Sequence, residues 1–86
     1  MAVTVELTYE MTKAFGAQRL EVAAATVAEA VKAAGLRLGE KGIEFDRLSR
    51  VAAVAVNGVL VNHKKGMKTR LADGDVVAFV KAAAGG

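Results

Sequence analysis

Hydrophobic and polar residues alternate in the first part of the chain in a way that predicts two β-strands. Over residues 3–9 every second residue is hydrophobic, which is typical of a strand with one buried face. Residues 19–24 alternate in the same way, with Leu20 and Val22 at the hydrophobic positions. Phe15-Gly16 marks a turn between them. We therefore expect an antiparallel hairpin whose connection is longer than a tight two-residue turn.

A helix is predicted after this hairpin. Thr26 and Glu29 form the Thr-x-x-Glu capping box, in which each side chain can accept a hydrogen bond from a free backbone N–H at the helix start. Hydrophobic residues follow at helical spacing as far as Ala34, and Gly35 supplies a left-handed stop. Glycines interrupt residues 36–50, so we expect a loop there, with one short helical turn near residues 46–49.

The second half of the chain predicts three strands joined by turns. Residues 51–56 are hydrophobic without alternation, which favours a central strand covered on one side by the helix. Asn57-Gly58 predicts a tight hairpin, because both residues tolerate positive φ, and residues 59–61 form a short return strand. The sequence Leu-Ala-Asp-Gly-Asp at residues 71–75 predicts another turn before a last strand at residues 76–80.

This order of elements predicts an α+β fold. A hairpin, a helix packed across it and a last strand returning beside the first give a β-grasp (ubiquitin-like) fold, with a mixed sheet of four to five strands and one main helix on one face. We expect residues 1–81 to form this single domain. Residues 82–86 are expected to be a flexible C-terminal tail that ends in Gly85-Gly86.

Composition removes most kinds of chemistry. The 86 residues include no cysteine, which excludes disulfides, thiolate metal sites and cysteine nucleophiles. His63 is the only histidine and has no partner nearby for a metal site or a general base, so no metal is expected. No phosphate-binding or dinucleotide motif is present, and no cofactor is expected to be bound. No hydrophobic run is long enough for a membrane span and no signal pattern begins the chain, so we expect a cytoplasmic protein.

Two charged clusters were candidates for binding or catalysis. Basic residues gather over residues 63–70 and suggest either a patch for nucleic acid or an acidic partner, or a solvated loop. No aromatic residue is interleaved for base stacking, so the loop is preferred and a nucleic-acid partner is not expected. Asp73 and Asp75 could form an acid pair, but Gly74 between them favours a turn with solvated carboxylates.

Several segments resemble the MoaD/ThiS family of ubiquitin-like sulfur carriers. They are the strand that ends in Asn57-Gly58, the turn at residues 71–75, the strand at residues 76–79 and the final Gly85-Gly86. The long segment between the helix and the third strand is more similar to MoaD. MoaD tails usually carry proline before the glycines, whereas this chain has Lys-Ala-Ala-Ala at residues 81–84.

The resemblance implies a protein co-substrate and no enzyme of its own, and the small subunit of a molybdopterin-synthase-like complex in the MoaD case. The Gly86 carboxylate would be adenylated by an ATP-dependent enzyme of the ubiquitin-activating type. A sulfur donor protein would then convert it to a thiocarboxylate for molybdenum or tungsten cofactor (molybdopterin) biosynthesis, with the large synthase subunit as a further partner. ATP is used by the partner enzyme.

The resemblance also assigns roles to individual residues. Gly85 and Ala84 would thread a narrow channel in the partner, which suits a tail of small cross-section. Phe79 and Lys81 would contact the docked partner, although Phe79 is equally suited to core packing and Lys81 to solvent. Three alternatives remain open: a carrier for thiamin or another sulfur-transfer pathway, a ubiquitin-like modifier conjugated to lysines through Gly86, and a β-grasp RNA-binding module.

Overall fold

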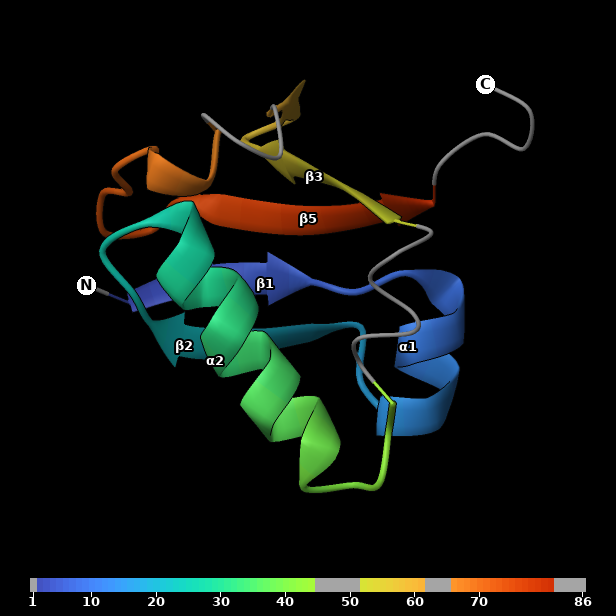
Figure 1. Cartoon of the computed structure of the whole chain (residues 1–86). Coiled ribbons are helices and arrows are strands. Elements are labelled where there is room, and N and C mark those ends of the chain that lie inside the picture. Colours follow the sequence, from blue (N-terminus) through green and yellow to red (C-terminus); the bar gives the residue numbers. More distant parts are fainter. Residues whose placement is uncertain (1, 45–51, 62–65, 82–86) are drawn as a thin grey trace.

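A computed structural model describes residues 2–44, 52–61 and 66–81 of the chain (Figure 1). The described residues form five strands, two α-helices and one 3₁₀-helix. In chain order these are β1 (Ala2–Glu6), α1 (Tyr9–Phe15), β2 (Arg19–Ala23), α2 (Val27–Gly39), β3 (Ala52–Val56), β4 (Val59–Leu60), the 3₁₀-helix η1 (Gly66–Lys68) and β5 (Val76–Lys81).

The five strands form one mixed sheet in the order β2-β1-β5-β3-β4. Strand β5 lies in the middle, parallel to β1 and antiparallel to β3, while β1–β2 and β3–β4 are antiparallel hairpins. Helix α2 crosses one face of the sheet (Figure 1). This arrangement confirms the predicted β-grasp fold with one main helix on one face. The strand predicted to be central, β3, lies inside the sheet, next to β5.

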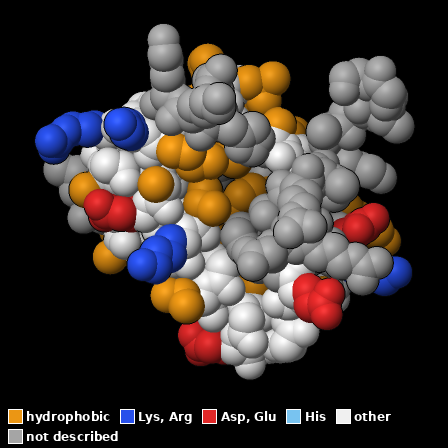
Figure 2. Space-filling view, viewed as in Figure 1, with side chains coloured by type: hydrophobic (Ala, Val, Ile, Leu, Met, Phe, Trp, Pro, Cys, Tyr) orange, Lys and Arg blue, Asp and Glu red, His pale blue; other side chains and the backbone are white. Residues whose placement is uncertain are grey.

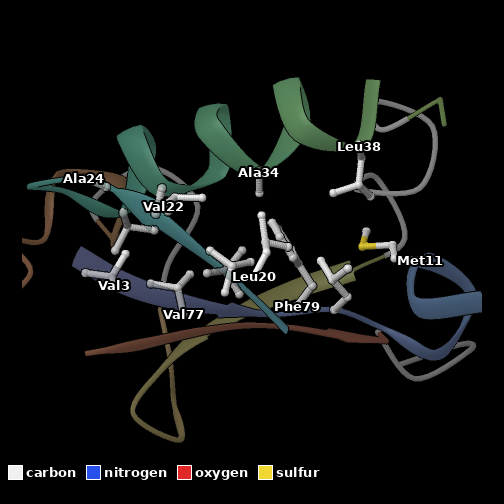
Figure 3. Packing of buried hydrophobic residues seen from close by; sticks show 14 of the residues in the cluster. Val3, Met11, Leu20, Val22, Ala24, Ala34, Leu38, Val77 and Phe79 are labelled. Atoms are coloured by element: carbon white, nitrogen blue, oxygen red, sulfur yellow. The ribbon is translucent and has the colours of Figure 1, made fainter. Parts of the chain in front are cut away.

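The core lies between α2 and the sheet. Alternate residues of the strands point toward the helix, as Val3, Val77 and Phe79 do in Figure 3. The helix meets them with small side chains, because Ala30 and Ala34 are fully buried. Alanine at the contact lets the helix backbone lie close to the strands, so a thin domain can still close its core.

A second helix replaces the predicted end of the first strand. The strand was expected to continue to residue 9, but β1 ends at Glu6 and α1 begins at Tyr9. Thr8 caps α1, its side-chain oxygen accepting a hydrogen bond from the Met11 N–H at 3.2 Å. Gly16 ends α1 in the left-handed region at φ 89°. The expected turn at Phe15-Gly16 is therefore a helix C-terminus, and the predicted pairing of the two strands is confirmed.

The main helix is longer than predicted. Gly35 was expected to stop it, but α2 continues to Gly39. Leu38 extends the buried stripe of the helix and is 0% exposed. Burying a leucine stabilises by about 1.5–3 kcal/mol, which exceeds the cost of about 1 kcal/mol for one glycine inside a helix. The loop prediction for residues 36–50 is thus wrong at its start, and the helical turn predicted near residues 46–49 lies outside the described residues.

The predicted Asn57-Gly58 turn is confirmed. Asn57 has φ 49° and Gly58 has φ 86°, which is the pair of positive values that a two-residue hairpin turn requires. Strand β4 leads back from this turn and is two residues long. Within the described residues, no helix is long and apolar enough to cross a membrane.

Candidate functional site

Strand β5 leads to the segment that the sequence marks as functional. Its last residue, Lys81, pairs with Ala52 of β3, whereas its last partner in β1 is Glu6, opposite Ala78. The middle strand of the sheet therefore extends three residues past its β1 pairing before the segment 82–86 begins. Ala84, Gly85 and Gly86 lie outside the described residues, and their assigned roles stay predictions.

The structure distinguishes the two predicted docking residues. Phe79 is 4% exposed and lies among the core residues facing α2 (Figure 3), which is the core-packing interpretation. Its side chain is therefore not offered to a partner on the surface. Lys81 ends β5 and its backbone pairs with Ala52. The predicted contact of Lys81 with a partner stays a prediction.

The side of the sheet away from α2 carries a hydrophobic surface that the sequence analysis did not identify. We define the open face as the residues of β3, β4 and β5 that alternate with the core residues: Ala53, Ala55, Leu60, Val76, Ala78 and Val80. Leu60 is 67% exposed and Val80 is 42% exposed. Ala55 is 6% exposed between its cross-strand partners Leu60 and Ala78. The two large exposed side chains therefore belong to one surface on the strand that precedes the tail and on its neighbours.

Polar residues border the open face along β1 and β2. Thr4 lies opposite Glu21, and Glu6 lies opposite Arg19 with the Arg19 Nε to Glu6 Oε2 distance at 2.9 Å. The surface that continues from β3 onto β2 thus changes from hydrophobic to charged at β1. On the α2 face, by contrast, basic and acidic side chains are interspersed around the hydrophobic ones (Figure 2).

Two turns that lie far apart in the sequence are joined by hydrogen bonds. The Asn57 side chain donates from Nδ2 to Asp75 Oδ1 at 3.2 Å and accepts at Oδ1 from the Val76 N–H at 3.0 Å. Asp75 Oδ2 accepts from the Ala72 N–H at 2.8 Å. We call Asn57, Ala72, Asp75 and Val76 the turn latch. It fixes the tip of the β3–β4 hairpin to the start of β5.

The latch explains the electrostatics of the two aspartates. The hydrogen bond from the Ala72 N–H, and then that from the Asn57 side chain, lower the pKa of Asp75 below its ordinary value. Asp73 Oδ1 instead accepts from the Ala2 N–H at 3.0 Å. The two carboxylates thus bind different backbone groups. This agrees with the predicted turn and places neither aspartate in an acid pair.

The basic cluster is described only in part. Lys68 and Arg70 are exposed, and Arg70 forms an isolated β-bridge with Thr26 at the start of α2. Both precede β5 in the chain, whereas the tail follows it. His63 lies outside the described residues. Within residues 2–44, 52–61 and 66–81, no group of three or more His, Cys, Asp or Glu side chains could hold a metal ion.

Comparisons with known proteins agree with this architecture. The Amycolatopsis orientalis BexX/CysO complex contains a chain that is 30% identical, with 98% of this chain and 99% of that chain covered and a TM-score of 0.71. A chain in the complex of subunits 1 and 2 of molybdopterin-converting factor from Helicobacter pylori is 24% identical, with 100% of both chains covered and a TM-score of 0.64. SAMP1 of Haloferax volcanii, a small archaeal modifier protein, is 20% identical over 100% of both chains with a TM-score of 0.72. No curated protein sequence matches significantly.

The family comparison covers nearly the whole chain. The model of the ThiS family matches residues 7–86, which include the open face, all four residues of the turn latch and the glycine pair. The resemblance to the MoaD/ThiS carriers drawn from the sequence is confirmed. The chain belongs to the ThiS family of small ubiquitin-like sulfur carriers.

Proposed function

We propose that this protein carries sulfur as a thiocarboxylate on Gly86, formed after a partner enzyme has adenylated the Gly86 carboxylate. The observation that carries the proposal is the glycine pair, which three alanines separate in the sequence from the middle strand of a β-grasp sheet. The family match runs through Gly86 and so includes the pair. In this proposal Gly86 ends the mature chain.

The chemistry needs an activated carboxylate. An oxygen of the Gly86 carboxylate attacks the α-phosphorus of ATP and releases pyrophosphate. The carboxylate oxygen, a poor leaving group by itself, then leaves as part of AMP. Hydrosulfide delivered by a donor protein attacks the acyl carbon, the bond from that carbon to the AMP oxygen breaks, and the thiocarboxylate remains on Gly86. ATP binds to the partner, and this chain contributes the acyl group and its position.

The fold suits a carrier whose reactive end enters a partner. Residues 82–86, if extended, span about 17 Å beyond Lys81 at roughly 3.3 Å per residue. Alanine and glycine side chains keep this segment thin. Docking of the folded domain converts the attack into a tethered reaction, so the end group is held at a high effective concentration.

The open face is the surface that we propose docks on the activating enzyme. It lies partly on β5, the strand that continues into the tail, so a partner that binds there also lies near the start of the tail. Leu60 and Val80 supply its exposed hydrophobic area. Such side chains at the centre of an interface commonly carry most of the binding energy. The charged residues along β1 and β2 would form one rim.

The pathway we propose is molybdenum or tungsten cofactor biosynthesis, with the large subunit of a molybdopterin-synthase-like complex as the acceptor partner. The similarity to a chain of the H. pylori molybdopterin-converting factor complex supports this choice. The similarity to a chain of the BexX/CysO complex supports a carrier for another sulfur-transfer pathway as the second candidate. Sulfur transfer from the thiocarboxylate to a reconstituted molybdopterin-synthase-like complex would support the first pathway, and absence of that transfer would support the second.

Intact-mass measurement of the protein from its native host tests the proposal. Replacement of one carboxylate oxygen by sulfur is expected in the wild type and absent after deletion of Gly86, with the fold retained because residue 86 lies beyond β5.

Leu60→Asp should weaken docking on the adenylating enzyme, whereas Leu36→Asp, which changes an exposed leucine of α2, should not. Isopeptide-linked targets without a thiocarboxylate would favour the modifier. Unchanged function after deletion of Gly86 would overturn both.

A further inference from the structure

The turn latch contains a dipeptide whose covalent chemistry the proposed function does not use. Asn57 and Gly58 are both exposed at the tip of the β3–β4 hairpin. Because glycine has no Cβ, its backbone nitrogen can approach the side chain of the preceding residue closely. An asparagine followed by glycine is therefore well suited to cyclise into a succinimide. Asn62, the other asparagine in the chain, is followed by His63 and lacks this advantage.

The reaction consumes one water and releases one ammonia. The backbone nitrogen of Gly58 attacks Cγ of Asn57, forming a new N–C bond while the proton of that nitrogen passes to solvent. The side-chain nitrogen leaves as ammonia and a five-membered ring remains. Water then opens the ring at either carbonyl. The products are aspartate, or isoaspartate with the backbone routed through the side chain.

The folded hairpin holds the reacting group away from this path. Asn57 Nδ2 donates to Asp75 Oδ1 and Asn57 Oδ1 accepts from the Val76 N–H, so both polar ends of the amide are bound to the segment that begins β5. Rotation of Cγ toward the Gly58 nitrogen requires both hydrogen bonds to break. We propose that Asn57 is a deamidation site which the turn latch protects while it is closed, and whose conversion prevents the latch from re-forming.

Deamidation reverses the polarity of the central contact. The Asn57 Nδ2 donor would be replaced by an oxygen at the position that now lies 3.2 Å from Asp75 Oδ1. Asp73, two residues before Asp75, adds a further negative group whose Oδ1 binds the Ala2 N–H. Two carboxylates at this distance repel each other, so the closed latch favours one shared proton and the ionised pair favours separation. At neutral pH the contact between the side chains of residues 57 and 75 is therefore lost at the hairpin tip, while the pairing of β3 with β5 and the hydrogen bond from the Asn57 N–H to the Val76 carbonyl at 2.8 Å remain.

Loosening of the hairpin tip also affects the open face, because Leu60 lies on β4 directly after the turn. This consequence rests on the proposed function. The chemical and stability tests below do not depend on it. A chain that deamidates as expected but never forms a thiocarboxylate would refute the proposed function alone.

The rate of conversion tests the protection. Wild type, Asp75→Ala and Gly16→Ala are incubated at mildly alkaline pH, and peptide mapping by mass spectrometry follows conversion at Asn57, with Asn62 as the internal reference. Gly16→Ala is the matched control, since it destabilises the fold far from the latch. Asp75→Ala should convert Asn57 roughly fivefold faster or more, the factor that loss of one ordinary hydrogen bond gives. Equal rates in Asp75→Ala and Gly16→Ala, or a wild type as fast as an unfolded peptide of residues 52–61, would overturn the proposal.

The pH dependence of the stability of the deamidated form tests whether conversion of Asn57 prevents the latch from re-forming. Asn57→Asp should show a thermal midpoint that rises as the pH falls from about 7 to 5, because the shared proton raises one pKa of the pair in the folded state. The exchanged pair Asn57→Asp/Asp75→Asn restores one donor and one acceptor and should return the midpoint and its pH slope toward wild type. The proposal would be overturned if Asn57→Asp had the wild-type pH slope. It would also be overturned if the exchanged pair left the midpoint as low as in Asn57→Asp, because the contact between residues 57 and 75 would then not determine stability.

Discussion

Leu38 provides the sharpest test of how the long helix is held on the sheet. It is 0% exposed in the last turn of α2, and Figure 3 shows it pointing into the core on the side of Met11. Substitution of a buried leucine by alanine removes transfer free energy and leaves a cavity, at a cost of about 2–5 kcal/mol. We expect Leu38→Ala to lower the free energy of unfolding by about 3 kcal/mol. A domain of 86 residues has roughly 4–13 kcal/mol in total.

Leu36→Ala is the matched control, because it makes the same chemical change two residues away on the same helix. Leu36 is 65% exposed, so its truncation should change stability by no more than about 0.5 kcal/mol. Urea unfolding followed by circular dichroism measures both variants. With a denaturant slope of about 1–2 kcal/mol per molar, Leu38→Ala should lower the midpoint by roughly 2 M.

Equal losses of unfolding free energy in the two variants would refute the inference that burial of Leu38 extends the helix beyond Gly35. A loss confined to Leu36→Ala would mean that the helix is rotated relative to the sheet. A change in the denaturant slope itself would point to a different denatured or native state instead of a lost contact.

The remaining predictions concern turns and close approaches. Asp75→Ala should destabilise the fold most above about pH 4 and progressively less as the pH falls. The ionised Asp75 side chain, whose pKa is lowered in the folded state, contributes stability that is lost when the side chain is protonated. Thermal midpoints of wild type and variant between about pH 6 and 2.5 measure this difference. Gly16→Ala should cost about 1–2 kcal/mol at φ 89°, whereas Gly39→Ala, in a helix with open space, should be neutral or stabilising in the same thermal scan. Gly66→Ala should lower the midpoint, since its Cβ would lie 2.5 Å from Cβ of Val61, and an unchanged midpoint would contradict this.

The sequence was sufficient for most of the sheet because the strands repeat a simple pattern. The alternation around Leu20 and Val22 predicted β2, and Asn57-Gly58 predicted the turn that the structure contains. Helix α1 was missed because Tyr9 continues the period of two that β1 begins, although it is 78% exposed. The better indication was local: a capping threonine, Thr8, stands before Met11 and Phe15, which are four residues apart and both buried.

The candidate site divides in the same way. The glycine pair can be found by inspection, since its chemistry depends on chain position and side-chain size. The open face could not be found by inspection of the sequence. Leu60 and Val80 share a surface only because β4 pairs with β3 and β3 pairs with β5. The latch likewise joins Asn57 to Asp75 across 18 residues of sequence. Such contacts follow from register, which no local pattern specifies.

The position of β5 also constrains how the protein is made. A ribosome synthesises the chain from its N-terminus, so β5 is the last described element to emerge, yet it is the strand that joins β1–β2 to β3–β4. Until it arrives, both hairpins present an unpaired edge and the sheet has no middle. Because β5 pairs with strands far away in sequence, its insertion closes long loops and is expected to be a slow step. Folding and access to the reactive end are thus coupled: a chain interrupted before residue 76 lacks both the sheet and the glycine pair.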